Sequence, residues 1–168
     1  MPAENRMTNL RTPADLVADV RLAHERGCGH GVPISVALKE LSAGEKQSDW
    51  IWYVFPQIRL GVTTMSKQFS VQTCADIAAL LDDSYIRANI SQAFVLAAGH
   101  ISSGASIASI FRHDDRKVRS SAALFAGYLD AKVRPDCAEF HAAASALRAA
   151  ADHEIGPCDA TLKFLQDC

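Results

Sequence analysis

The chain has 168 residues, of which 49% are hydrophobic and 21% are charged, and its formal net charge is −2. This length suits one domain and is short for two, and a domain of this size buries enough surface to fold without a metal or a disulfide. The small net charge argues against nucleic acid or an acidic membrane as a partner. No apolar run approaches the roughly 20 residues that cross a bilayer, and the N-terminus lacks the apolar core of a secretory signal. We therefore expect a cytoplasmic protein.

Apolar residues at helical spacing predict a mainly α-helical fold. The clearest helix start is Thr12-Pro13-Ala14-Asp15, with Thr12 as N-cap, proline in the first turn and an aspartate at the positive end of the helix dipole. Residues 1–11 ahead of it predict a flexible tail. The expected helices cover residues 12–26, 33–43, 73–81, 84–98, 105–111, 114–130, 136–152 and a last turn or two from 159, with a loop around Gly61.

Only residues 50–55 and 69–73 compete as strands, and two short strands do not make a stable sheet alone. No repeat, low-complexity linker or second domain is visible. We therefore predict a single compact multi-helix domain over residues 12–168, with little or no sheet.

The five cysteines are odd in number and widely spaced, which predicts reduced thiols. Cys74 and Cys137 lie in predicted helices and are expected as buried fillers. His24-x-x-x-Cys28-x-His30 could supply zinc ligands, but a fourth ligand is not visible nearby and three glycines loosen the loop. A polar helix end followed by a flexible linker is the favoured interpretation, and neither a metal nor a cofactor is expected.

Residues 50–57, Trp-Ile-Trp-Tyr-Val-Phe-Pro-Gln, contain both tryptophans of the chain. Ser48 as an N-cap and Pro56 as a stop favour a short, largely buried helix, although aromatic enrichment also suits a strand. The rings are then either plain core, which is the favoured interpretation, or the wall of a pocket where one ring stacks on a flat ligand. A buried tryptophan needs a partner for its indole N–H, and Gln57 would offer an amide at the pocket rim.

Residues 112–121 form the densest polar stretch and open a predicted helix whose N-cap is Asp114 or Asp115. Free N–H groups at such a helix start attract anions. The favoured interpretation is a solvated helix start in which Asp115 pairs with Arg119, and anion binding is the alternative. The residues that would hold a phosphate or carboxylate are Lys117, Ser120 and Ser121, which share one helix face.

Together these segments resemble an uncharacterised bacterial family, catalogued as domain of unknown function 1810. Residues 37–57 resemble its Ala-x-x-Glu-Leu-x-x-Gly-x-Lys-x-Ser-His-Trp-Met-Trp-Tyr-Ile-Phe-Pro-Gln. Residues 110–125 resemble its Ile-Phe-Gly followed by Asp-Asp-x-Lys-x-x-Ser-Ser-x-x-Leu-Phe, and Gly156 and residues 159–162 resemble its closing Gly, Asp and Thr-Leu. The resemblance covers about residues 36–165 and implies a mainly α-helical fold. It implies no catalytic residue, because the family's activity is not established.

Three departures from the family pattern stand out. Asp49 replaces the family's histidine before the first tryptophan, and Ala123 replaces its threonine before Leu-Phe. The glycine after Ile-Phe is missing, and Arg112-His113 fills a shortened link.

We expect a module that binds a small anionic, nucleotide-like ligand between residues 50–57 and 114–121. The alternatives are an enzyme, a hydrolase or transferase acting on such a ligand with the aspartates at 49, 114 and 115 as its carboxylates, and a protein-interaction module with exposed aromatic anchors. The sequence does not predict the oligomeric state. The expected ligand-binding residues are Trp50, Trp52, Gln57, Asp115, Lys117, Ser120 and Ser121.

Overall fold

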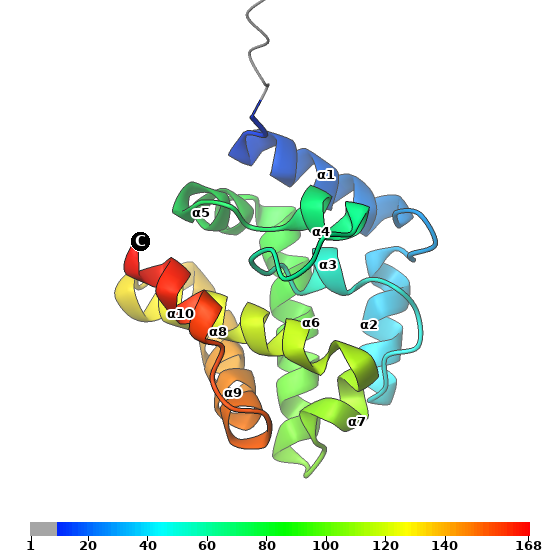
Figure 1. Cartoon of the computed structure of the whole chain (residues 1–168). Coiled ribbons are helices and arrows are strands. Elements are labelled where there is room, and N and C mark those ends of the chain that lie inside the picture. Colours follow the sequence, from blue (N-terminus) through cyan, green and yellow to red (C-terminus); the bar gives the residue numbers. More distant parts are fainter. Residues whose placement is uncertain (1–9) are drawn as a thin grey trace, which may run out of the picture.

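The computed structural model describes residues 10–168 and is built almost entirely from helices (Figure 1). Within these residues, extended pairing is limited to an isolated parallel bridge between Ile58 and Val71. The prediction of a single, mainly α-helical domain is confirmed, while most of the predicted tail lies outside the described residues. The helices are α1 (Pro13–Arg26), α2 (Ile34–Ala43), α3 (Ile51–Val54), α4 (Thr64–Phe69), α5 (Cys74–Asp82), α6 (Ser84–Ser102), α7 (Ile107–Phe111), η1 (Arg112–Asp114), α8 (Asp115–Ala131), η2 (Pro135–Cys137), α9 (Ala138–Glu154) and α10 (Asp159–Gln166).

Local capping chemistry sets the helix starts that the sequence predicted. Thr12 accepts a hydrogen bond from the backbone of Asp15, whose carboxylate accepts one in return, and Thr73 and Asp76 form the same reciprocal box at the start of α5. Both predicted starts are therefore confirmed. Helix α6 was expected to have Ser84 as its cap, but Ser84 is its first residue, because Asp83 supplies the capping oxygen.

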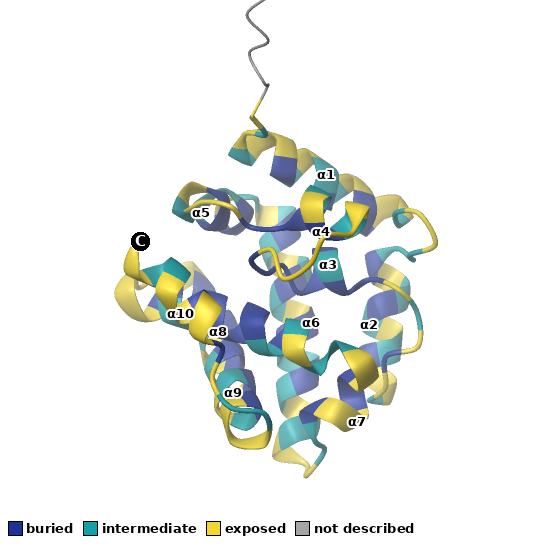
Figure 2. Cartoon of the chain, viewed as in Figure 1, coloured by how far each residue is buried: buried dark blue, intermediate teal, exposed yellow. Residues whose placement is uncertain are grey.

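A cluster of five phenylalanines joins the helices around α6, which runs through the middle of the molecule (Figure 1). The Phe55 ring stacks on Phe94 with 4.6 Å between centroids and meets Phe111 edge-on at 5.0 Å. Phe140 meets Phe94 at 4.8 Å and Phe125 at 5.1 Å. Figure 2 shows that buried residues, in dark blue, gather on the parts of the helices that face the interior of the molecule. The cluster fixes the end of the aromatic segment 50–57 against α6, α7, α8 and α9.

None of the helices in the described part of the chain combines the length and apolar character needed to span a membrane.

Two features of residues 48–70 differ from the sequence-based expectation. The short helix α3 is confirmed, but Trp50 occupies its N-cap position because the Ser48 hydroxyl is bonded to Glu40 instead. The expected loop after Pro56 contains helix α4, which Thr63 caps by accepting a hydrogen bond from Ser66 N at 3.1 Å. The Thr63 cap is a local signal for a helix, but a helix of one to two turns is too short to show a periodic apolar pattern in the sequence.

Cys74, at the start of α5, is joined to Cys168 by a disulfide, with 5.6 Å between the Cα atoms. The expectation of reduced thiols is therefore wrong for this pair. The two residues are 94 positions apart, so only the placement of α10 beside α5 brings them together. Cys28, Cys137 and Cys158 are free, and Cys137 is buried as expected of a filler.

The glycine-rich stretch 27–31 is packed against α3 and is not a loose linker. A Cβ built on Gly31 would lie 2.4 Å from Tyr53 Oη, so this position has no room for a side chain. His24, next to this stretch, is fully buried with Nε2 2.6 Å from the Tyr53 carbonyl oxygen. Among residues 10–168 no group of three His, Cys, Asp or Glu side chains is arranged to hold a metal ion.

Candidate functional site

Glu40, at the end of α2, organises the start of the aromatic segment. Its Oε2 accepts hydrogen bonds from Gln47 N at 2.8 Å, Ser48 N at 3.0 Å and Trp50 Nε1 at 2.7 Å, and its Oε1 accepts one from the Ser48 hydroxyl. Burial opposes ionisation of this carboxyl, but the hydrogen bonds outweigh burial and hold the pKa of Glu40 below its ordinary value. Glu40 is not among the site residues predicted from the sequence, and the signal for it was its place in the family motif over residues 37–57.

Trp50 is a core residue and has no surface to offer a ligand. Its exposed fraction is 0%, Glu40 satisfies its indole N–H, and its ring lies 6.1 Å from that of Phe55. Of the two interpretations of the rings, the core interpretation therefore holds for Trp50. The same enclosure removes Trp50 as an exposed anchor for a protein partner.

Ser120 and Ser121 are also enclosed, and each bonds to a distant part of the chain. The Ser120 hydroxyl lies 2.8 Å from Thr161 Oγ1, which ties α8 to α10, and the Ser121 hydroxyl donates to the Pro56 carbonyl oxygen at 2.7 Å. Both serines are 0% exposed. The expectation that they hold an anion is not met, because α8 enters the core after its first turn and turns this face inward. The Ser121 bond instead holds the aromatic segment against α8.

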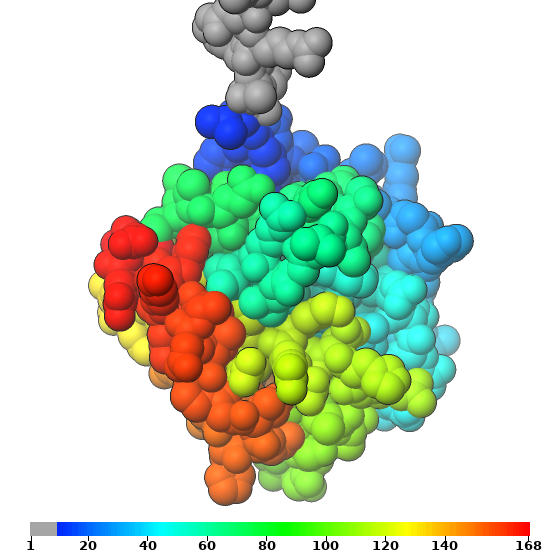
Figure 3. Space-filling view, viewed as in Figure 1, coloured from blue at the N-terminus to red at the C-terminus, as the bar shows by residue number. Residues whose placement is uncertain are grey.

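Trp52 and Lys117 bring the two predicted segments together at the surface. The Lys117 ammonium lies 4.6 Å from the centroid of the Trp52 ring, which is within the range of a cation–π contact. The two residues line two adjoining hollows on the face where segment 58–69 meets the start of α8 (Figure 3). The two hollows thus share one wall, which is formed by the aromatic ring of Trp52 and the ammonium-bearing side chain of Lys117.

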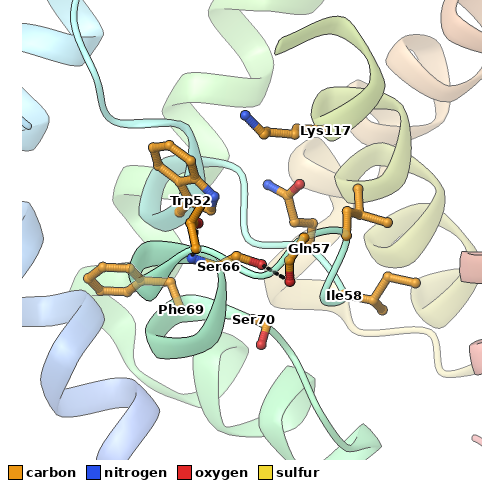
Figure 4. A pocket seen from close by; sticks show the side chains of 10 residues that line it. Trp52, Gln57, Ile58, Ser66, Phe69, Ser70 and Lys117 are labelled. Atoms are coloured by element: carbon orange, nitrogen blue, oxygen red, sulfur yellow. Dashed lines mark hydrogen bonds between the residues drawn. The ribbon is translucent and has the colours of Figure 1, made fainter.

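One hollow, which we name the apolar lobe, has a volume of about 100 Å³. Gln57 is 4% exposed and donates from Nε2 to the Phe55 carbonyl oxygen at 3.1 Å, so its amide is held in place. The Ser66 hydroxyl donates to the Gly61 carbonyl oxygen at 3.1 Å. Figure 4 shows Lys117 and Gln57 extending toward Trp52 from α8 and from the segment after α3. The lobe is lined by Trp52, Gln57, Ile58, Leu60, Gly61, Thr63, Ser66, Phe69, Ser70 and Lys117.

Ser70 is a buried polar residue in the lining of the apolar lobe. Its residue is 3% exposed, and its hydroxyl has no hydrogen-bond partner among residues 10–168. A buried hydroxyl without a partner costs about 1–3 kcal/mol. Figure 4 shows Ser70 on the side of the lobe opposite Lys117, with its hydroxyl pointing away from Lys117.

The second hollow, which we name the charged lobe, has a volume of about 280 Å³ and is centred on Asp114. The Asp114 carboxylate pairs with Lys46 at 2.8 Å and with Lys117 at 2.7 Å, and Lys46 also donates to the Ser48 carbonyl oxygen at 2.7 Å. Burial opposes ionisation of Asp114, but hydrogen bonds from Lys117 and Lys46 outweigh it and hold its pKa below the ordinary value. The lobe is lined by Lys46, Gln47, Asp49, Trp52, Phe111, Arg112, His113, Asp114 and Lys117.

Asp115 does not join either lobe. Its carboxylate accepts a hydrogen bond from Arg116 N, and Arg119 donates to the Gly156 carbonyl oxygen at 3.2 Å in place of the expected pair with Asp115. Asp114 occupies the N-cap position but makes no side-chain cap, since its carboxylate is committed to the lysines. Of the seven expected ligand-binding residues, the structure brings together Trp52, Gln57 and Lys117.

Arg112, in the turn between α7 and α8, has backbone angles of φ 56° and ψ −118°. No other non-glycine residue among residues 10–168 has a positive φ. These angles match the first central position of a type II′ turn, which glycine usually occupies. Arg112 directly follows Ile110-Phe111, where the family pattern has glycine, a residue that adopts these angles without strain. In this chain the position carries an arginine that lines the charged lobe.

The fold and the paired lobes define an all-α domain with a small surface site between two sequence motifs. A model of the family described as "Protein of unknown function (DUF1810)" matches residues 30–153, and the chain belongs to this family. The matched range contains residues 37–57 and 110–125 but ends before Gly156. The resemblance seen in the first two motifs is therefore confirmed.

A similar fold occurs in the crystal structure of the conserved hypothetical protein Rv1873 from Mycobacterium tuberculosis. The two sequences are 28% identical, the match covers 82% of this chain and 87% of that chain, and the TM-score is 0.65. No curated protein matches the chain.

The departures from the family pattern fall in two places. Asp49, Arg112 and His113 all line the charged lobe. Ala123 lies in α8 with an exposed fraction of 2%, away from solvent. The residues that distinguish this chain from the family pattern are thus concentrated in the charged lobe.

Proposed function

We propose that this protein binds a small, flat, anionic ligand, such as a nucleotide, across the apolar and charged lobes. The observation that carries the proposal is the shared wall, in which Trp52 and Lys117 separate an apolar hollow from a charged one. A ring of the ligand would stack on Trp52 beside the Gln57 amide, and its anionic group would pair with Lys117. Sites for small molecules commonly combine an apolar wall with a few well-placed polar groups in this way.

The sizes of the lobes support a ligand in two parts. The apolar lobe, at about 100 Å³, is smaller than the cavity of about 150 Å³ that accommodates benzene. It therefore holds part of one ring, and the rest of the ligand extends past Trp52 into the charged lobe.

The charge balance of the site favours an anion. Asp114 carries one negative charge between two lysines, so the three side chains together keep one positive charge. The Lys117 side chain is 31% exposed, whereas that of Lys46 is 8% exposed. Lys117 is therefore the cation that an incoming ligand reaches.

Binding is favoured over acid catalysis by the state of Asp114. Because its pKa lies below the ordinary value, this carboxyl has no proton to donate near neutral pH. A hydrolase or transferase would need another residue of the site as its proton donor, and Asp49 is the other carboxylate that lines the charged lobe. Turnover of a bound nucleotide that disappears in Asp49→Asn would replace the binding proposal with this alternative.

The two tryptophans allow a direct test with AMP, ADP, ribose and inorganic phosphate. A ligand that binds only the folded state raises the melting temperature, and stacking on Trp52 changes its fluorescence. In Trp52→Phe the ligand should still raise Tm, but the change in fluorescence should vanish, because the remaining Trp50 is enclosed. Trp52→Ala should lose both responses, since stacking on an aromatic ring contributes about 1–3 kcal/mol per base.

Lys117→Ala should lower the affinity about 10- to 100-fold, as expected for the loss of a hydrogen bond to a charged group. Lys132→Ala is the matched control, because Lys132 lies 5.2 Å from the Tyr128 ring in a similar contact and lines neither lobe. Equal affinities of Lys117→Ala and Lys132→Ala, or no response to any of the four compounds, would refute the proposal.

A further inference from the structure

The backbone of Arg112 is held in a conformation that a residue with a Cβ adopts only at a cost. Its angles, φ 56° and ψ −118°, are comfortable for glycine and strained for arginine. Strained residues of this kind persist where the surrounding structure holds them, and they cluster at functional sites.

The folded state gains little from the Arg112 side chain. Its only ion pair among residues 10–168 joins Nε to Glu45 Oε1 at 3.6 Å, and the side chains are 57% and 49% exposed. Exposed pairs of this length contribute little to stability. The contacts of Arg112 within the fold therefore do not account for the strain.

The strained turn places Arg112 in the lining of the charged lobe, which Lys117 also lines from α8. Lys46, the other strong cation of that lobe, is bonded to Ser48 and Asp114 and is largely buried. Two cations from different elements are exposed enough for a ligand to reach, although each has an acidic partner. Arg112 is 57% exposed and paired with Glu45, and Lys117 is 31% exposed and paired with Asp114. The fork of a guanidinium matches two oxygens of a phosphate, whereas a lysine ammonium acts as a point charge.

We infer that Arg112 is a specificity-determining residue that holds a second anionic group. The preferred ligand then carries two linked phosphates, as a nucleoside diphosphate does, with one phosphate on Lys117 and the other on Arg112. This inference rests on the proposed function and specifies the class of ligand for the same site.

The test compares AMP with ADP, and inorganic phosphate with pyrophosphate, by calorimetry on the full chain. The wild type should bind ADP more tightly than AMP. Arg112→Gly should lower the affinity for ADP about 10- to 100-fold and change the affinity for AMP less than about threefold. Arg112→Lys keeps the charge and should retain part of the preference. Arg116→Ala removes an exposed arginine that does not line the lobe and should leave both affinities unchanged.

Arg112→Gly should also raise the Tm of the free protein by about 2–4 °C, because glycine relieves the turn. An unchanged or lower Tm would overturn the strain argument. Equal affinity for AMP and ADP in the wild type, or an ADP preference that survives Arg112→Gly, would overturn the inference and leave the proposed function standing. If no compound binds, both fail. The same dependence on Arg112 with pyrophosphate would show that the residue recognises the linked phosphates themselves.

Discussion

Replacement of Glu40 tests whether one carboxylate holds the aromatic segment in place. Glu40→Gln keeps the size of the side chain but removes the charge that four hydrogen bonds share. A hydrogen bond to a charged group contributes about 1.5–3 kcal/mol and a neutral one about 0.5–1.5 kcal/mol, so each loses roughly 1 kcal/mol. Four bonds set an upper limit of about 4 kcal/mol on the loss of unfolding free energy. We expect a loss of about 2–3 kcal/mol, because Glu40 is only half-buried and partly screened by solvent.

Glu40→Ala should cost more, about 3–5 kcal/mol, because the indole N–H of Trp50 is then buried without a partner. The assay is urea unfolding at neutral pH, with Tm as a second measure; about 2–3 kcal/mol corresponds to a fall of about 4–12 °C. Glu45→Gln is the matched control, since Glu45 lies in the same connection and is about half exposed. It should change stability by less than about 0.5 kcal/mol.

The same variants give a second measure through pH. Because the folded-state pKa of Glu40 lies below its unfolded value of 4.5, its contribution is fully present above pH 4.5 and is lost as the pH falls through the folded-state pKa. Glu40→Gln should therefore reduce the acid sensitivity of the protein. If Glu40→Ala and Glu45→Gln unfold at the same urea concentration, the carboxylate does not organise the segment.

Three further predictions concern the disulfide, a close contact and a buried histidine. Cys168→Ser opens a 94-residue loop and should lower the free energy of unfolding by up to about 4.7 kcal/mol according to the chain-entropy relation. A reductant should destabilise the wild type in urea but not the variant, and a wild type whose stability does not respond to reductant would contradict the disulfide. Gly31→Ala places a Cβ against Tyr53 Oη and should lower the free energy of unfolding by about 1–3 kcal/mol. Gly99→Ala, where a Cβ would have no neighbour within 4 Å, should raise it by about 0.5–1 kcal/mol. Equal unfolding midpoints of the two variants would refute this prediction. Burial lowers the pKa of His24 below its ordinary 6.5, so the wild type should lose stability as the pH falls below 6.5, because the unfolded chain takes up the proton first. His24→Gln should lack this dependence of stability on pH. If the dependence persists in the variant, it belongs to another group.

Local sequence signals predicted most of the helices, because helix starts depend on residues three or four positions apart. The boxes at Thr12 and Thr73 are complete within four residues, and the structure contains both. Helix α4 was missed although Thr63 caps it, since so short a helix shows no periodic apolar face. The disulfide was missed for a different reason, because spacing along the chain says nothing about which ends meet.

The candidate site was predicted in part. The aromatic and polar segments do adjoin, through Trp52 and Lys117 and through the Ser121 bond to Pro56. The sequence could not show which of two similar residues is available to a ligand. Trp50 is enclosed and bonded to Glu40, while its neighbour two positions on lines both lobes.

The sequence by itself determined the helical fold, the family and the two segments that carry the distinctive chemistry, because these depend on short-range patterns and motifs. The tertiary structure alone decided which side chains of those segments face solvent. Helical spacing placed Lys117 and Ser121 on one face, but the packing of α8 into the core buried the serine and left the lysine accessible. Burial and hydrogen-bond partners come from residues far apart in the chain, and only the folded arrangement of the helices specifies them.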